Sequence, residues 1–257
     1  MSEPGAEGPT LAPPPSPADV GVVMALPTEA GFLIDRLARV RRYKARSLTV
    51  IEGELEGRVL AVIVSGVGLA SARRGAARLL DGHRPRLLVS AGFAGALDPN
   101  LNRNDLAIPR TIVNAAGEAV EVDERLANAN AVPAIRRVDR LLLVDRVITE
   151  PSEKGRLRDE HKADLIDMET FGVAVAARDR AVPFISLRVV SDDARSELPP
   201  EVARLLNASG SYRVGAALRA IWGRPSAAKD FWKLHSQATE AADRLAKGLQ
   251  VLLRGLD

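Results

Sequence analysis

The stretch DLIDMETFGVAVAARDRAVPFISLRVVSDDA, from Asp164 to Ala194, contains the pattern that decides the fold. Its apolar runs predict a strand over 163–168, a helix over 169–180 and a second strand over 182–192. Carboxylates stand at both edges of this apolar segment. A strand, a helix and a further strand in this order predict two parallel strands with the helix packed on one face of their sheet.

The rest of the chain continues this alternation. Residues 20–26, VGVVMAL, predict a strand buried on both faces, and Pro27 suits the start of a helix over 27–40. We predict a three-layer α/β/α fold with a central mixed, mostly parallel twisted sheet, followed by C-terminal helices. The other expected elements are a hairpin over 47–66 turning at Glu56-Gly57, a helix over 69–82 ended by Gly82, a strand that enters a glycine-rich loop within 84–97, strands over 105–113 and 140–149, and a helix over 152–161.

The two ends of the chain differ from this pattern. Residues 1–18 hold six prolines, without the basic start and apolar stretch of a signal peptide, so we expect a disordered tail. Residues 19–257 are predicted to form one domain whose C-terminal extension, from about 198 to 257, holds three helices. The last helix has a basic flank, formed by Lys229, Lys233, Arg244, Lys247 and Arg254. Packing on the domain or on a second subunit is the favoured interpretation, and peripheral membrane contact is the alternative.

Composition excludes several classes of function. The formal net charge of the 257 residues is only +3 and aromatic residues make up 4%, so no nucleic-acid partner is predicted. The chain has no cysteine, which excludes disulfides, thiolate catalysis and cysteine-ligated zinc and fits a cytoplasmic protein. We expect no metal site and no cofactor, because the three histidines, His83, His161 and His235, are far apart and predicted to lie at the surface.

Three carboxylates follow or end predicted strands: Glu29, Glu169 and Asp192. One carboxylate can accept both hydroxyls of a vicinal diol, a second can deprotonate water, and a third, when protonated, can protonate a leaving group. Such a set suits cleavage of a bond to a sugar carbon. Each residue also has a simpler interpretation, because an acidic residue in the first turn of a helix caps it or complements its dipole.

Two glycine-containing segments accompany these carboxylates, SGVG at 65–68 and SAGFAG at 90–95. We expect both to be loops in which backbone N–H groups approach an anion or a sugar oxygen. Neither matches the dinucleotide-binding fingerprint, so alone they indicate little.

The order of five stretches resembles the nucleoside phosphorylase and nucleosidase superfamily, closest in layout to 5′-methylthioadenosine/S-adenosylhomocysteine nucleosidases. The resemblance covers roughly residues 20 to 195. The stretches are VGVVMALPTEAGFL, VSGVGLASA, SAGFAGALDPNLNRNDLAIP, LIDMETFGVA and VPFISLRVVSD.

The resemblance implies a role for each matching residue. Glu29 would activate the attacking water, Glu169 would take the 2′- and 3′-hydroxyls of the ribose, and Asp192 would protonate N7 of the purine. The other implied substrate-binding residues are Gly66, Phe93, Ala94, Asp167, Met168 and Ser191, together with Val147 at the position of a base-stacking aromatic ring. The resemblance also implies a purine nucleoside substrate and a homo-oligomer, a dimer or larger.

The chain departs from the nucleosidases in three places. Val147 replaces the stacking ring, whose loss would cost about 1 kcal/mol of base recognition, so either another side chain substitutes for it or the substrate differs. Phe93 replaces a small hydroxyl residue, and the region 110–131 is shorter than their substrate-covering loops.

Three alternatives stay open. The C-terminal third resembles hopanoid-associated nucleoside phosphorylases, which implies adenosyl-hopane as substrate and phosphate as possible co-substrate. Glu29 in the first loop would repel phosphate, which favours hydrolysis. A non-catalytic nucleoside-binding protein on the same fold, or a structural partner in an assembly, is the competing class.

Overall fold

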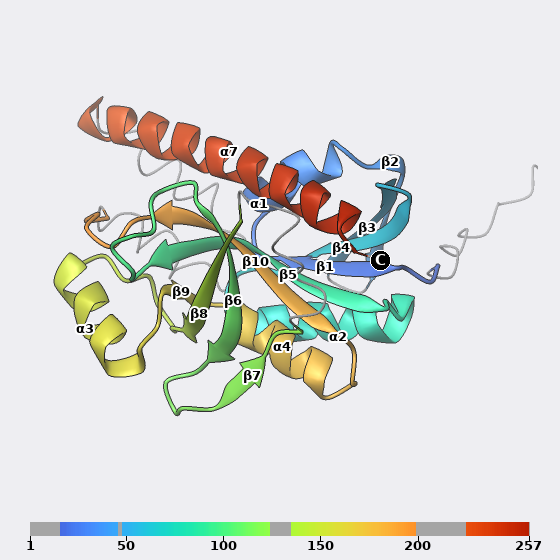
Figure 1. The fold of residues 1–257 in the computed structure, drawn as a ribbon. Helices are drawn as coiled ribbons and strands as arrows, with labels where there is room; N and C mark the ends of the chain where they lie inside the picture. The colour runs from blue at the N-terminus through green and yellow to red at the C-terminus, as the bar shows by residue number, and fades with distance from the viewer. Residues whose placement is uncertain (1–15, 46–47, 124–134, 199–224, 257) are drawn as a thin grey trace, which may run out of the picture.

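The computed structural model describes residues 16–45, 48–123, 135–198 and 225–256, with side chains from residue 236 onward in the last range. These residues form one ten-stranded sheet with helices on both sides (Figure 1). The strands are β1 Val20–Met24, β2 Ala38–Ala45, β3 Leu48–Leu55, β4 Arg58–Val64, β5 Leu87–Ala96, β6 Leu106–Val113, β7 Ala119–Glu121, β8 Ile135–Leu143, β9 Leu165–Asp167 and β10 Phe184–Asp192. The helices are α1 Pro27–Ile34, α2 Leu69–His83, α3 Pro151–His161, α4 Thr170–Arg178 and α7 Pro225–Arg254.

The sheet is mixed, as expected. Its order is β10-β6-β8-β9-β5-β1-β4-β3-β2, with β7 beside β6, and β10 also pairs with β5. Five strands therefore form a closed ring, in the order β5, β10, β6, β8 and β9. The sheet continues on the other side of β5 with β1, β4, β3 and β2. The core strands β4, β1, β5 and β10 run parallel, so their carboxyl ends meet at one edge.

Local sequence explains the central elements. Every residue of β1 is buried, as its continuous apolar run predicts. The hairpin of β3 and β4 turns at Glu56-Gly57, where both residues have positive φ (51° and 74°), the backbone of a tight two-residue hairpin turn. The three elements predicted at 163–192 are confirmed as β9, α4 and β10. The expectation that the two strands are parallel is wrong, because β9 runs antiparallel to β5 whereas β10 runs parallel to it.

Helices cover both faces of the sheet (Figure 1): α1 and α7 pack together on one side, and α2 and α4 on the other. The favoured interpretation of the last helix is confirmed for its described side chains, because its apolar stripe is buried against the domain. The buried residues are Ala241, Ala242, Leu245, Ala246, Leu249, Leu252 and Leu253. Within the described part of the chain, no helix is long and apolar enough to span a membrane.

The helix predicted over 27–40 is wrong beyond Ile34. Residues 38–45 form β2, an antiparallel edge strand on β3, and Val40 is 40% exposed. Four of the eight residues of β2 are charged and none is fully buried, so no buried apolar face marks it as a strand. Its pairing with β3 overrides the apparent helical spacing of Leu37 and Val40.

Other boundaries also move. The segment 90–95 continues β5 instead of forming a loop, residues 144–149 lie beyond the end of β8 instead of forming a strand, and α2 ends at His83 with Arg84 in the left-handed region. Ala18 is buried and its N–H bonds the His83 carbonyl, so the packed part begins before residue 19. Predictions for residues 1–15, 124–131 and 199–224, which include the first two C-terminal helices, lie outside the described residues.

The prediction that His83 lies at the surface is wrong. Its side chain is 3% exposed, and Nε2 lies 3.0 Å from Glu52 Oε1 and 2.5 Å from the Tyr43 hydroxyl. These partners come from β2 and β3, which pairing in the sheet brings against the end of α2.

Helix α4 approaches α2 closely at Gly172. A Cβ added there would lie 2.5 Å from the Leu69 carbonyl oxygen and 3.2 Å from the Arg73 amide nitrogen. Both atoms belong to the backbone of α2 and cannot rotate away, so we expect Gly172→Ala to lower the free energy of unfolding by about 1–3 kcal/mol. The melting temperature should then fall by about 2–4 °C for each kcal/mol of unfolding free energy that is lost.

The matched control is Gly155→Ala on α3, where an added Cβ meets nothing within 4 Å. Alanine is a better helix former than glycine, so this variant should melt at or above the wild-type temperature. A Gly172→Ala protein that melts with the wild type would contradict the close helix contact.

Candidate active site

Glu29 connects the first helix to the central strand. It lies in the first turn of α1, and its Oε2 accepts hydrogen bonds from the N–H groups of Ala25 (2.9 Å) and Leu26 (2.8 Å). Oε1 accepts from the N–H of Phe93 on β5 at 2.8 Å. The helix-capping interpretation of Glu29 is therefore correct, but the same carboxylate also reaches across to β5.

Burial sets the proton affinity of this carboxylate. Glu29 is 3% exposed. Loss of solvation raises its pKa above the ordinary value, although the hydrogen bond from Phe93, those from Leu26 and Ala25 and the nearby Arg188 charge lower it. A carboxylate with a raised pKa is a stronger base when it is ionised.

Asp167 and Glu169, at the start of α4, accept hydrogen bonds from different parts of the chain. Asp167 caps the helix by accepting the Thr170 N–H at 3.1 Å. Glu169 makes no side-chain cap, and its Oε1 instead accepts the N–H of Gly68 at 2.7 Å. Gly68 has φ 95° and Gly66 has φ 85°, a conformation that favours glycine. The segment at 65–68 thus turns a backbone N–H toward Glu169.

The surroundings of Glu169 strongly raise the pKa of its carboxyl group. Burial, together with the charges of Asp167 and Glu29, raises its pKa to about 8, against the hydrogen bond from Gly68 and the Arg188 charge. Because the Glu29 and Asp167 charges act on Glu169, the three carboxylates belong to one electrostatic cluster.

Arg188 is the buried cation of that cluster, in the middle of β10 with 2% exposure. Its Nη2 lies 3.0 Å from Asp167 Oδ2 and donates to the hydroxyls of Ser90 and Thr170. A Cβ added at Gly92 would lie 2.4 Å from Arg188 Nη1 and 2.8 Å from Glu29 Oε1. Only glycine at 92 lets the arginine and the glutamate approach β5 together.

Asp192 ends β10 opposite Gly95 of β5. The Ser191 hydroxyl lies 2.7 Å from Asp192 Oδ1 and 3.2 Å from the Ala94 carbonyl oxygen. Lys154 Nζ on α3 lies 2.6 Å from Asp192 Oδ2. The capping interpretation holds for the neighbouring Asp193, which accepts the Arg195 N–H at 2.9 Å.

The structure thus gathers most predicted site residues around the carboxyl half of β5. Among the described residues, Val147 is the predicted site residue outside this hydrogen-bond network. It is half-buried in the segment between β8 and α3, which a hydrogen bond from Leu198 N–H to the Thr149 carbonyl (3.1 Å) links to the segment after Asp192.

Sequence reasoning missed Lys154, Ser90 and Thr170 as part of the site, and it did not place Arg188 there. An arginine inside the apolar run VPFISLRVV was the one available signal, since a charge within a buried strand needs a partner.

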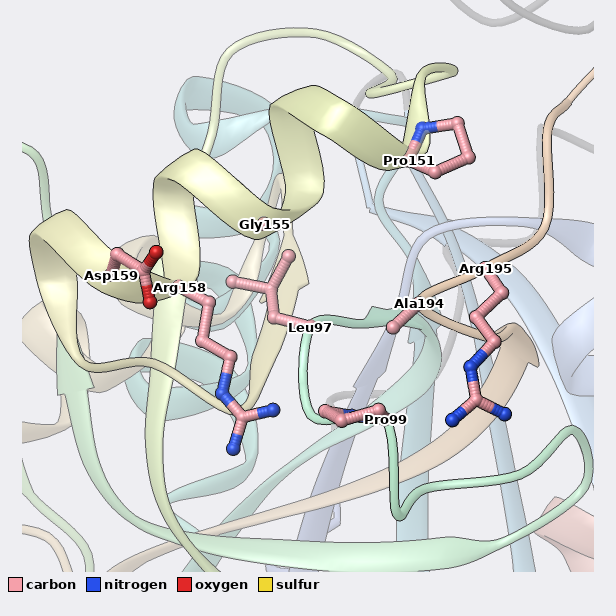
Figure 2. A pocket seen from close by; sticks show the side chains of 8 residues that line it. All are labelled: Leu97, Pro99, Pro151, Gly155, Arg158, Asp159, Ala194 and Arg195. Atoms are coloured by element: carbon pink, nitrogen blue, oxygen red, sulfur yellow. The ribbon is translucent and has the colours of Figure 1, made fainter.

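A cavity of about 380 Å³ lies beside the segment that follows Asp192 (Figure 2). In Figure 2, α3 forms one wall, Leu97 and Pro99 lie after β5, and Ala194 and Arg195 lie opposite α3. The three proposed catalytic and ribose-binding carboxylates, Glu29, Glu169 and Asp192, do not line this cavity. Within the described ranges, no group of three His, Cys, Asp or Glu side chains could hold a metal ion.

Comparison with known proteins finds nucleosidases among the relatives of this chain. A curated 5′-methylthioadenosine/S-adenosylhomocysteine nucleosidase from Maridesulfovibrio salexigens is 25% identical over 197 residues, covering 67% of this chain and 85% of its own length. One from Staphylococcus haemolyticus is 24% identical over 195 residues, covering 67% and 86%.

A solved structure of the same kind of enzyme shows the same fold. The nucleosidase from Neisseria meningitidis, in complex with methylthio-immucillin-A, superposes with a TM-score of 0.73 at 19% identity, over 92% of this chain and 99% of that one. The family model described as Phosphorylase superfamily matches residues 19–218, which is most of the chain. The chain therefore belongs to the phosphorylase superfamily.

Proposed function

We propose that the protein cleaves the N-glycosidic bond of an adenosine-type nucleoside with a 5′-substituent and releases adenine. The observation that carries this proposal is the placement of Glu29, Glu169 and Asp192 around the carboxyl half of one strand, β5, each with a different set of partners. The curated relatives named as 5′-methylthioadenosine/S-adenosylhomocysteine nucleosidases supply the substrate class.

Each carboxylate has the surroundings that its task needs. Glu29, with a raised pKa, takes a proton from the attacking water. Glu169 accepts the two ribose hydroxyls beside the N–H of Gly68. Asp192 protonates the leaving purine, with Ser191 holding its other oxygen. Gly66, Phe93, Ala94 and Met168 line the ribose side of the same site.

Water is the nucleophile in this proposal. A phosphate dianion would meet the Glu29 carboxylate at short range, and the nearby Arg188 is already paired with Asp167 at 3.0 Å. Phosphate therefore finds no unneutralised cation at Arg188, whereas a water molecule meets a base.

Two finer parts of the proposal are a cytoplasmic location, which the lack of cysteine favours, and a homo-oligomer, which the resemblance implies. The adenosyl-hopane alternative depends on the C-terminal third, of which residues 199–224 lie outside the described structure. Membrane contact through the last helix is weakened as a proposal, because Arg244, Lys247 and Arg254 bond to the Asn104 carbonyl, Asp243 and Glu56 respectively.

The first test is adenine release from 5′-methylthioadenosine, with and without phosphate. We expect release that phosphate does not accelerate, and we expect Glu29→Gln and Asp192→Asn each to lower kcat by about 10²–10⁴-fold, the usual contribution of one acid or base. Asp81→Asn removes an exposed carboxylate that pairs with Arg180 and should leave kcat unchanged.

Retained nucleoside binding by the two site variants would show that they lost chemistry and not folding. A wild type that binds the nucleoside and never releases adenine would support the non-catalytic alternative instead.

Glu169 should also make stability depend on pH. Its pKa is about 8 in the folded protein against 4.5 for an ordinary glutamate, so between these values the folded state binds the proton more tightly than the unfolded chain. Stability from this group is therefore lost as pH rises from about 4.5 to about 8. Glu169→Gln keeps an acceptor for the Gly68 N–H and removes the charge, so its melting temperature relative to wild type should rise by a few degrees between pH 5 and pH 8.5.

Thermal melts across this pH range provide the measurement, and Glu118→Gln, at an exposed carboxylate paired with Arg178, provides the control. Above pH 8, where Glu169 is mostly ionised, Glu169→Gln should also weaken nucleoside binding, because an amide accepts the two hydroxyls less well than a carboxylate. A melting difference that stays constant with pH would show that Glu169 is ionised throughout.

A further inference from the structure

Lys154 is buried where a lysine is costly. Helix α3, PSEKGRLRDEH, is polar, and Lys154 is its one buried residue, with 0% exposure. Taking an ammonium group out of water costs several kcal/mol unless the group is paired and hydrogen-bonded. The proposed function so far gives this lysine no part.

The hydrogen bonds of Lys154 go to the last residue of β10 and to the segment that follows it. Its Nζ lies 2.6 Å from Asp192 Oδ2, 2.8 Å from the Asp193 carbonyl oxygen and 3.3 Å from the Ser196 carbonyl oxygen. An ammonium group has three N–H donors, so these three acceptors use all of them. The lysine is oriented by two carbonyl oxygens toward a single carboxylate.

Asp192 in turn accepts at both of its oxygens, from Ser191 at Oδ1 and from Lys154 at Oδ2. A carboxylate that only accepts hydrogen bonds carries no proton to give. Protonation of a leaving purine therefore needs a proton source, and the ammonium group 2.6 Å away is the nearest cation.

We propose that Lys154 is a positioning residue that acts through Asp192, holding its carboxylate in place and supplying it with the proton that the leaving purine takes. The inference rests on the proposed function and adds the source of the proton.

The step balances as follows. The C1′–N9 bond breaks and its electron pair goes to the purine, while N7 takes a proton from Asp192 and Asp192 takes one from Lys154 Nζ. Water forms the new bond to C1′ and loses its proton to Glu29. Adenine leaves neutral, Lys154 is left as a neutral amine, and the proton on Glu29 returns to Lys154 through solvent, which restores the resting charges.

A purely structural anchor would also be buried, so the test must separate leaving-group protonation from folding. Two substrates do so: 5′-methylthioadenosine, whose purine needs a proton to leave, and the 4-nitrophenyl glycoside of the same 5′-methylthioribose, whose phenolate leaves without one. Lys154→Met removes the ammonium group, and Lys154→Arg keeps a charge. Glu153→Gln is the control on the same helix, where it breaks a pair with the half-exposed Arg146.

We expect Lys154→Met to lower kcat on methylthioadenosine by about 10²–10³-fold, and to leave kcat on the nitrophenyl glycoside within about threefold. Lys154→Arg should recover part of the lost activity, Glu153→Gln should match the wild type on both substrates, and Lys154→Met added to Asp192→Asn should cause no further loss. If Lys154→Met does not fold, Lys154→Arg alone should still lower kcat on the nucleoside by more than on the glycoside.

Equal losses on both substrates would show that Lys154 only supports the fold, and unchanged kcat on both would show that Asp192 needs no partner; either result overturns the inference. Full nucleosidase activity in wild type together with either result leaves the proposed function standing. A wild type that cleaves neither substrate overturns the proposed function and the inference together.

Discussion

The site depends on one buried ion pair, between Arg188 and Asp167, whose side chains are 3% and 1% exposed. Arg188 also bonds to Ser90 on β5 and Thr170 on α4, so a single side chain ties three elements together. The free energy lost by removing both charges from water is about as large as the free energy gained from their attraction. The pair therefore fixes the positions of these side chains more than it adds to the net stability of the fold. Gly92 leaves the room that this arrangement needs.

The same pair decides how charge is distributed among the carboxylates. Because Asp167 neutralises Arg188, Glu29 and Glu169 lack a cation of their own, and burial raises the pKa of both. Asp192, opposite Gly95 of β5, pairs instead with its own lysine, Lys154. Different surroundings for chemically similar groups are what an acid and a base in one site require. Ionisation of the buried Glu169 lowers the stability of the folded protein. Such a loss of stability is common at functional sites.

The sequence predicted elements whose signals are local. The apolar run of β1, the glycine turn between β3 and β4 and the unit from β9 to β10 can be seen within a few residues. β2 was missed because a charged edge strand carries no such signal. The segment 90–95 was expected to be a loop because its glycines suggest turns, whereas Gly92 is needed inside β5 for the approach of Arg188 and Glu29. Glu29, Glu169 and Asp192 could be predicted because each lies at or just after the end of a predicted strand. Lys154 and His83 could not, because their burial depends on partners that are distant in the sequence, Asp192 and Glu52.

The account makes one central claim, that a single nucleoside is held by Glu169 at its sugar, by Asp192 at its base and by Glu29 at the attacking side. A crystal structure of the Asp192→Asn variant with 5′-methylthioadenosine tests it most directly. We expect both ribose hydroxyls within about 2.5–3.2 Å of Glu169, N7 facing residue 192, and Glu29 facing C1′. A nucleoside bound elsewhere, for example in the cavity beside α3, with these three side chains free of it, would contradict the claim.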